Sequence, residues 1–169
     1  MIKLILSSIT HAEVGAQESV DLAIDHALVD DLELIQLQGS LQLTRVADGI
    51  SIYGELDTQV RTECTRCLTP FLQPVTIELE DIINLPGAES TQERPVTVDQ
   101  DGWADLTPLV REYTWLGLPG SPICSPDCKG ICPRCGGNRN LGECTCGEPV
   151  SIDPRWEVLR DLISESDQA

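Results

Sequence analysis

Basic residues are scarce in this sequence. Its 169 residues contain 11 lysines and arginines against 28 aspartates and glutamates, which gives a formal charge of −17. The imbalance lies mainly in residues 1–110, which hold 19 acids and 5 bases. A chain this acidic repels phosphate backbones unless it carries a separate basic face. The composition therefore disfavours direct nucleic-acid binding and favours a basic protein partner, the alternative being that the acidity only keeps the protein soluble.

Aromatic residues and long apolar runs are also scarce. With one Phe and two Tyr, the core must be aliphatic. No apolar run approaches the roughly 20 residues that span a bilayer. The first residues, MIKLILSSITHAEV, lack the long apolar region and cleavage site of a secretory signal, and we interpret them as a first strand. We therefore expect a cytoplasmic protein with no membrane partner, in a compartment where thiols stay reduced.

The residue combinations of common catalytic sites are missing as well. The sequence shows no nucleophile–base pair, carboxylate dyad or phosphate-binding loop. We therefore predict neither an enzyme nor a small-molecule substrate. The two histidines, His11 and His26, lie far from the cysteines in sequence and are not needed as metal ligands.

Period-two alternation of apolar and polar residues is the clearest regular pattern. Such alternation is typical of strands that place one face on a core and the other in water. It occurs in three segments, residues 34–46, 50–63 and 71–85. The corner at 47–49 suits a tight hairpin with Gly49 at positive φ, and residues 64–70 form the second corner. The pattern predicts a three-stranded antiparallel meander, followed by an exposed loop over residues 86–102.

Two helices are predicted after the meander. The first lies within residues 105–119, with Asp105 or Thr107 as cap, Pro108 in its first turn and its end at Gly117. The second begins with Asp153 as N-cap and Pro154 at its first position. The expected apolar faces are Leu109, Val110, Tyr113 and Leu116 in the first, and Trp156, Leu159, Leu162 and Ile163 in the second. Trp115 and Trp156 are expected to pack the two helices together in the core.

Together these elements predict the α+β class. We expect an antiparallel β-rich body with a short helix, a cysteine-rich zinc-knuckle segment and a C-terminal helix. The body with the short helix covers residues 1–119, and the cysteine-rich segment with the C-terminal helix covers residues 120–169. The two parts are expected to fold together as one domain.

Eight cysteines form a pattern of short spacings that is typical of metal sites. They are Cys64, Cys67, Cys124, Cys128, Cys132, Cys135, Cys144 and Cys146. Two thiolates from one tight turn can bind half of a tetrahedral zinc ion, and a second turn supplies the other half. Gly136, Gly137 and Gly147 permit the positive φ that points backbone N–H groups toward sulfur. We predict one or two structural zinc ions, in preference to disulfides, a redox centre or catalytic zinc.

The pairing of these ligands stays open at this point. The preferred scheme joins the last four cysteines in one site and the first four in another, which closes a loop of roughly 60 residues between the hairpin tip and the C-terminal segment. In the alternative, Cys64 and Cys67 meet Cys132 and Cys135. A third scheme has one occupied site and four idle thiols. Arg66 either offsets the charge of a site or faces solvent.

A small group of basic and amide residues lies among the later cysteines. The group comprises Lys129, Arg134, Asn138, Arg139 and Asn140, and it is the best candidate for contact with RNA or a partner. Asp127 and Glu143 nearly cancel its charge, and no row of aromatic residues accompanies it for base stacking. We therefore favour solvated basic turns with asparagines that cap the local backbone.

The motifs taken together resemble the YceD family of large ribosomal RNA accumulation proteins. The resemblance covers roughly residues 30–163. The matching residues are Cys64, Arg66, Cys67 and Leu68, then Leu116 to Pro119, then Cys124, Cys128, Gly130, Cys132, Pro133, Cys135, Gly136, Asn138, Asn140, Cys144 and Cys146, and finally Asp153, Pro154 and Arg155.

The resemblance implies a role in ribosome biogenesis, through accumulation of the large-subunit (23S) ribosomal RNA. It does not require that the protein touch RNA. The charge of residues 1–110 instead favours a basic large-subunit ribosomal protein as partner, with contact to ribosomal RNA indirect or weak. The alternatives are a direct RNA-binding zinc protein and a thiol or zinc redox sensor.

Overall fold

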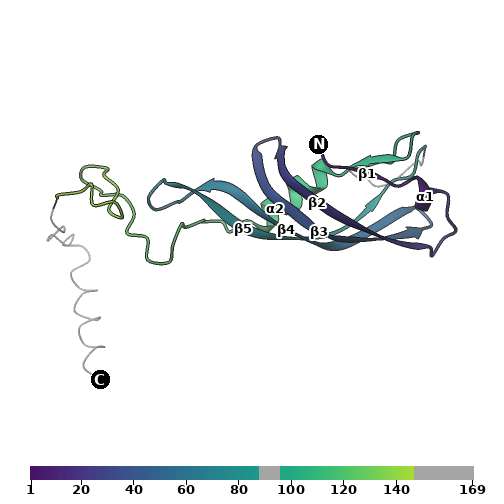
Figure 1. Cartoon of the computed structure of the whole chain (residues 1–169), viewed down its shortest axis with the longest axis horizontal. Helices are drawn as coiled ribbons and strands as arrows, with labels where there is room; N and C mark the ends of the chain where they lie inside the picture. The colour runs from purple at the N-terminus through teal and green to yellow at the C-terminus, as the bar shows by residue number, and fades with distance from the viewer. Residues whose placement is uncertain (88–95, 147–169) are drawn as a thin grey trace, which may run out of the picture. The chain divides into compact units, whose positions relative to one another are not determined.

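A computed structural model describes residues 1–87 and 96–146 of the chain. The chain divides into two compact units, Met1–Cys128 and Lys129–Ala169, and every helix and strand among the described residues lies in the first unit (Figure 1). The helix predicted after Asp153 and the conformation predicted for Gly147 lie outside the described residues. The domain division after residue 119 stays a prediction.

A four-stranded antiparallel sheet forms the body of the first unit. Its strands are β2 (Gln17–Val29), β3 (Leu32–Val46), β4 (Gly49–Glu63) and β5 (Pro70–Ile83), and they neighbour one another in chain order. The last three are the predicted meander, and the β-rich α+β class is confirmed. The strand β2 was not predicted, so the sheet has one more strand than expected, and β2 occupies the edge that β3 would have formed.

Short elements pack on one face of this sheet. They are β1 (Lys3–Ile5), which pairs with β6 (Trp103–Asp105), and the helices α1 (Ser7–Thr10) and α2 (Thr107–Gly117). Figure 1 shows β1 and α2 over the same side of the sheet. Neither helix of the described chain is long and apolar enough to cross a membrane.

The core between the sheet and these elements is aliphatic, as the shortage of aromatic residues predicts. Alternate positions of β3, β4 and β5 supply its centre, since successive side chains of a strand point to opposite faces. The largest fully buried side chains in these strands are Leu34, Leu37, Leu41, Leu43, Ile50, Ile52, Leu56, Ile77 and Leu79. The opposite face of the sheet carries polar and acidic side chains and stays exposed.

The first corner of the meander differs from the prediction at Gly49. Val46 pairs with Gly49, so the turn consists of Ala47 and Asp48, and Gly49 does not have a positive φ. The requirement for glycine there is steric, because a Cβ at Gly49 would lie 2.3 Å from the carbonyl oxygen of Ile83 on the neighbouring strand.

The segment predicted as an exposed loop, residues 86–102, is buried in part. Val96 and Val98 are buried, and Thr97 forms a parallel bridge with Asn84. The prediction is therefore wrong for these residues, while residues 88–95 lie outside the description. The polar residues around the two valines conceal a short alternating segment that closes one end of the core.

The helix α2 confirms two predicted features and corrects two others. Pro108 lies in its first turn and its last residue is Gly117, as expected. The N-cap position is occupied by Leu106, not by Asp105 or Thr107, although the Asp105 carboxylate accepts a hydrogen bond from the N–H of Thr107 at 2.9 Å.

The buried face of α2 also differs from the predicted one. Leu109 and Val110 are buried as expected, but Leu116 is 74% exposed and Trp115, expected in the core, is 49% exposed. Thr114 takes the buried position next to them, and its hydroxyl donates to the carbonyl of Val110 at 2.5 Å. The helix packs against β5, which sets its orientation and turns Trp115 and Leu116 outward.

Candidate metal centres

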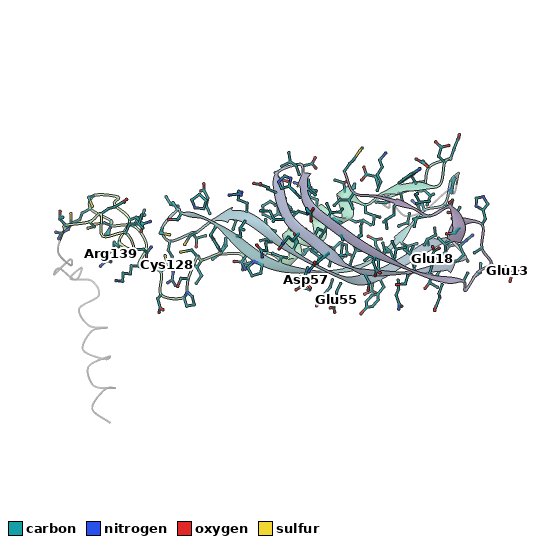
Figure 2. The ribbon with its side chains drawn as sticks, viewed as in Figure 1. Glu13, Glu18, Glu55, Asp57, Cys128 and Arg139 are labelled. Atoms are coloured by element: carbon teal, nitrogen blue, oxygen red, sulfur yellow. The ribbon has the colours of Figure 1, made fainter. Side chains whose placement is uncertain are left out.

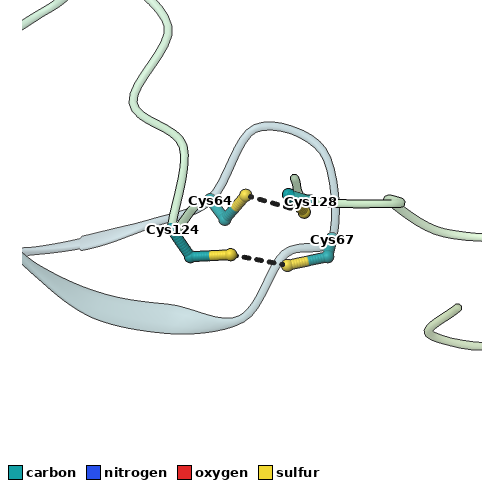
Figure 3. Close-up of side chains that lie close together, drawn as sticks. All are labelled: Cys64, Cys67, Cys124 and Cys128. Carbon is teal, nitrogen blue, oxygen red and sulfur yellow. Dashed lines mark hydrogen bonds between the residues drawn. The ribbon is translucent and has the colours of Figure 1, made fainter. Parts of the chain in front are cut away.

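The first cluster of cysteines, cage 1, lies at the tip of the β4–β5 hairpin. The hairpin turn supplies Cys64 and Cys67, and the segment that follows α2 supplies Cys124 and Cys128 (Figure 3). The turn is held by hydrogen bonds from the Leu68 N–H to the Cys64 carbonyl at 2.8 Å and from the Cys64 N–H to the Thr69 carbonyl at 3.0 Å. The backbone of the turn thus directs both sulfur atoms of the hairpin toward the same point.

Sulfur–sulfur distances in cage 1 suit a tetrahedral metal ion. The Sγ atoms of Cys64 and Cys128 are 3.8 Å apart, those of Cys67 and Cys124 are 3.7 Å apart, and all four lie within 4.8 Å of one another. Four sulfurs at 2.3 Å from one zinc ion are separated by about 3.8 Å in a regular tetrahedron. All eight cysteines of the chain are free, since a disulfide would place its two sulfurs about 2 Å apart.

Apolar side chains pack around cage 1, and backbone hydrogen bonds hold its two parts together. Cys64, Cys67 and Cys128 are buried, with Phe71 and Ile123 packed against them. The segment that carries the second pair is joined to the hairpin by hydrogen bonds from the Thr65 N–H and hydroxyl to the Pro122 carbonyl, at 2.9 and 3.1 Å. These contacts bring together two parts of the chain that are distant in sequence.

Arg66 lies in the middle of the cage 1 turn, and its guanidinium donates to the carbonyl of Cys128 at 3.3 Å. It therefore contacts the segment that carries Cys124 and Cys128, while its side chain stays exposed. Both roles considered from the sequence, charge compensation and a solvent-facing side chain, are compatible with this geometry and stay predictions.

The thiols of cage 1 have unequal affinities for protons. Burial opposes ionisation of Cys64, but backbone N–H groups of Cys124, Cys67 and Arg66 outweigh it and lower the pKa of Cys64 to about 6. Burial, followed by the neighbouring thiols, raises the pKa of Cys124 to about 12. One thiol thus ionises near neutral pH while another retains its proton, because several thiolates at this spacing repel one another. A bound cation would remove that repulsion, which is the chemistry expected of a metal ligand set.

The second cluster, cage 2, lies entirely in the second unit. Cys132, Cys135, Cys144 and Cys146 place their sulfurs within 4.8 Å of one another. The first pair sits on a tight turn closed by the Gly136 N–H to the Cys132 carbonyl and by the Cys132 N–H to the Gly137 carbonyl, both at 2.9 Å. Gly136 has φ +73°, as predicted, whereas Gly137 does not have a positive φ. This turn resembles the thiolate-binding turn of a zinc knuckle.

Backbone dipoles also favour a thiolate in cage 2. The N–H of Arg134 points at the Sγ of Cys132 at 3.4 Å, and N–H groups of Cys135 and Arg134 lower the pKa of Cys132 to about 6. The hydrogen bond shared with Cys132 raises the pKa of Cys144 to about 12. In both cages backbone N–H groups thus lower the pKa of one thiol, Cys64 or Cys132, while the pKa of a neighbouring thiol, Cys124 or Cys144, is raised.

The two clusters are the same as the two sites of the preferred pairing scheme. The structure does not bring Cys64 and Cys67 together with Cys132 and Cys135 in one group. Four sulfurs are the ligand set of a closed tetrahedral site for zinc or iron. That these cysteines hold an ion, and which ion, stays a prediction.

The five candidate contact residues of the second unit have local structural roles. The Asn140 side chain accepts from the N–H of Lys129 at 2.8 Å, and the Asn138 side chain accepts from the N–H of Asn140 at 2.9 Å. The N–H of Arg139 donates to the Gly130 carbonyl at 3.0 Å. The asparagines therefore cap the backbone, as favoured from the sequence, and contact with RNA or a partner stays a prediction for this group.

Sequence analysis did not identify the residues around cage 1 or the geometry of the acidic surface. Phe71 is the only phenylalanine of the chain and follows Cys67 by four residues, which was the available signal for an apolar cover. The acids Glu55, Asp57, Glu78 and Glu80 of β4 and β5 occupy the polar positions of the alternation, so their common face follows from the strand period. Figure 2 shows Glu55 and Asp57 together on that outer face.

These features define a class of protein: an antiparallel β body with two four-cysteine clusters suited to metal ions. The chain belongs to the YceD family, whose model, described as "Large ribosomal RNA subunit accumulation protein YceD", matches residues 52–163. That description names an accumulation protein and not an enzyme.

Relatives of known sequence match over most of the chain. An uncharacterized protein of Mycobacterium tuberculosis is 32% identical over 157 residues, which cover 86% of this chain and 68% of the relative. The "Large ribosomal RNA subunit accumulation protein YCED homolog 1, chloroplastic" of Arabidopsis thaliana is 23% identical over 140 residues, 66% of this chain and 44% of the relative. No solved structure matches the chain significantly.

Metal content gives the most direct test of the two clusters. We expect two metal ions per chain by elemental analysis of protein purified without chelator, because each cluster supplies four thiolates at tetrahedral spacing. Cys128→Ser and Cys132→Ser are each expected to reduce the content to about one ion. Ser125→Ala, a substitution within the same segment that spares every sulfur, is the control. A wild-type content of zero would contradict both sites.

Proposed function

We propose that this protein is a non-enzymatic factor for accumulation of large-subunit ribosomal RNA that acts by binding a basic ribosomal protein. The family description and the name of the Arabidopsis relative support the first part. The outer face of the sheet supports the second. On this proposal, the acidic sheet presents to the basic protein a charge pattern similar to that of RNA.

The observation that carries the proposal is a row of carboxylates without basic neighbours. Asp21, Glu55, Asp57, Glu78 and Glu80 are exposed on one face of the sheet. Their cross-strand partners on that face are serine, glutamine, threonine, tyrosine or another acid. None of the ion pairs found among the described residues involves these five acids. This surface, named here the acidic face, is therefore available to a Lys/Arg-rich partner.

The acidic face carries a cost in stability. Glu55 lies directly opposite Glu78 in the β4–β5 register, and like charges at that position destabilise a sheet. A positively charged partner would remove the repulsion when it binds. Neutral substitutions on this face should accordingly leave the fold as stable as before, or make it more stable, while they weaken binding.

Zinc is the ion we propose for both cages, in a structural role. Four cysteine thiolates complete a tetrahedral shell, so no position is left for water or substrate. Cys64, Cys67, Cys124 and Cys128 would hold one ion, and Cys132, Cys135, Cys144 and Cys146 the other. The ion of cage 1 would connect the hairpin tip to residues 121–128.

The test compares binding to purified Lys/Arg-rich large-subunit proteins with binding to a large-subunit ribosomal RNA fragment, at matched ionic strength. We expect tighter binding to a protein. The triple variant E55Q/E78Q/E80Q should weaken it about tenfold or more, because three exposed charge pairs contribute up to about 1 kcal/mol each.

The control variant E13Q/D48N/D101N removes the same charge from exposed positions outside the four strands of the sheet and should bind within about twofold of wild type. Tighter binding to the RNA fragment, with a steep dependence on salt, would instead favour the direct RNA-binding alternative. If the two triple variants lose the same amount of affinity for the ribosomal protein, the net charge of the chain, and not the acidic face, accounts for binding.

A further inference from the structure

Several exposed apolar side chains of the first unit gather in one groove. The groove has a volume of about 790 Å³ and is lined by Leu28, Trp115 and Leu116, together with Met1 and Pro108. Leu28 is 66% exposed, Leu116 is 74% exposed and Trp115 is 49% exposed. On a soluble protein, a contiguous patch of exposed apolar side chains commonly marks a site of interaction with another molecule.

The fold explains why this groove is open. Leu28 lies near the end of β2, next to the turn into β3, while Trp115 and Leu116 lie on α2 with exposed side chains. Arg111 of α2 donates to the Asp31 carboxylate at 2.8 Å and lies 3.6 Å from that of Asp30. This ion pair connects α2 to the β2–β3 turn and fixes the two walls of the groove.

The charge around the apolar floor is negative. Asp30, Asp105 and Glu112 line the groove together with two positive groups, the Arg111 guanidinium and the amino group of Met1, which lies close enough to Asp105 to lower the pKa of its carboxyl group. Arg111 is already paired with Asp30 and Asp31. An apolar segment flanked by lysine or arginine would therefore complement both the apolar side chains and the negative charge of the groove, whereas an acidic segment would be repelled.

We infer that this groove binds an amphipathic helix whose apolar face is flanked by basic residues, within the basic partner of the proposed function, on which the inference rests. An apolar helical face in a hydrophobic groove is a common mode of recognition. The high exposure of Leu28 and Leu116 favours a macromolecular occupant, because a small ligand would leave most of their surface in water.

The first test uses the full-length protein and the ribosomal protein that binds it best. The variant Leu28→Ser/Leu116→Ser should weaken binding at least about tenfold, since it removes two apolar contacts at the centre of the proposed interface. Val14→Ser is the matched control: Val14 is also exposed and apolar but lies outside the groove, and the change should alter affinity by less than about twofold. An unchanged affinity in the double variant would overturn the groove and leave the proposed function intact.

The second test does not depend on the ribosomal partner. A synthetic helix with leucines on one face and lysines on the other is compared with a peptide of equal charge in which serine replaces leucine. We expect the wild type to prefer the leucine peptide about tenfold, and the double variant to lose that preference. If the wild type prefers the leucine peptide but binds no ribosomal protein, the proposed function is refuted and the groove is supported. If the wild type binds both peptides equally, the groove is refuted. A dimer that the double variant abolishes would identify a second copy as the occupant and would overturn the inference.

Discussion

Removal of bound metal is expected to unfold residues 129–146 while the four-stranded sheet stays folded. Among these residues the one buried apolar side chain is that of Cys132, and the backbone consists of two turns, an isolated bridge between Ile131 and Asn138, and irregular segments. Metal binding supplies on the order of 10 kcal/mol in small zinc domains, which is far more than these turns can replace. The sheet has a separate aliphatic core that contains no cysteine.

Hydrogen exchange measures this difference directly. With metal bound, the amides of Cys132, Gly136 and Arg139 should be protected, because each donates to a backbone carbonyl of the same unit. After treatment with a strong chelator they should exchange at unprotected rates, while amides of β3 and β4 keep their protection. Cys132→Ser should reproduce the loss without chelator, and Cys128→Ser should leave these three amides protected. Continued protection in the metal-free protein would show that the turns are stable by themselves.

The strands identified from the sequence are those with long stretches of regular alternation. β3, β4 and β5 bury every second residue over most of their length, so their period is visible without any knowledge of the partner strands. In β2 the alternation of Val20, Leu22 and Ile24 changes phase before Ala27. The change coincides with an irregular register near Gln36, whose φ of +55° marks a bulge in β3. A change of phase caused by the neighbouring strand cannot be inferred from the local sequence of β2.

The same limit explains the error on α2. Helical spacing identifies the residues that share a side, but the packing partner selects which side is buried. The contact with β5 buries Leu109, Val110 and Thr114 and leaves Leu116 in the groove. A close approach of Gly117 to Val75, where an added Cβ would lie 2.9 Å from a methyl carbon, contributes to that choice.

The cysteine spacing identified eight candidate ligands and favoured the observed grouping, but it left other groupings open. Because Cys124 follows Cys67 by 57 positions, the chain is long enough to bring either of the competing later pairs to the hairpin. Local contacts decide the result: Pro122 receives both hydrogen bonds of Thr65, and Ile123 packs with Phe71 over the sulfurs. These contacts depend on residues outside the cysteine motif, which carry no metal-binding signature of their own.

Loss of cage 1 is expected to destabilise the first unit, in contrast to loss of cage 2. Its ion would join Cys67 to Cys124 and so close a loop of 57 residues in the unfolded chain. A cross-link over a loop of this length stabilises a protein by about 4 kcal/mol through the entropy of the unfolded state. The variant C64S/C67S should therefore lower the free energy of unfolding of the first unit by about that amount. Urea denaturation of the metal-loaded protein, followed by far-UV circular dichroism of the sheet, measures the change.

The matched control is C132S/C135S, which removes the equivalent pair of cage 2. Because that pair lies in the second unit, the urea midpoint of the sheet should change by an amount equivalent to less than about 0.5 kcal/mol. In C64S/C67S the amide of Thr65 should also lose protection, since its acceptor, the Pro122 carbonyl, is no longer held at the hairpin. Equal midpoints in the two variants would show that cage 1 does not constrain the unfolded chain, and that the contacts of Thr65, Phe71 and Ile123 hold this segment without an ion.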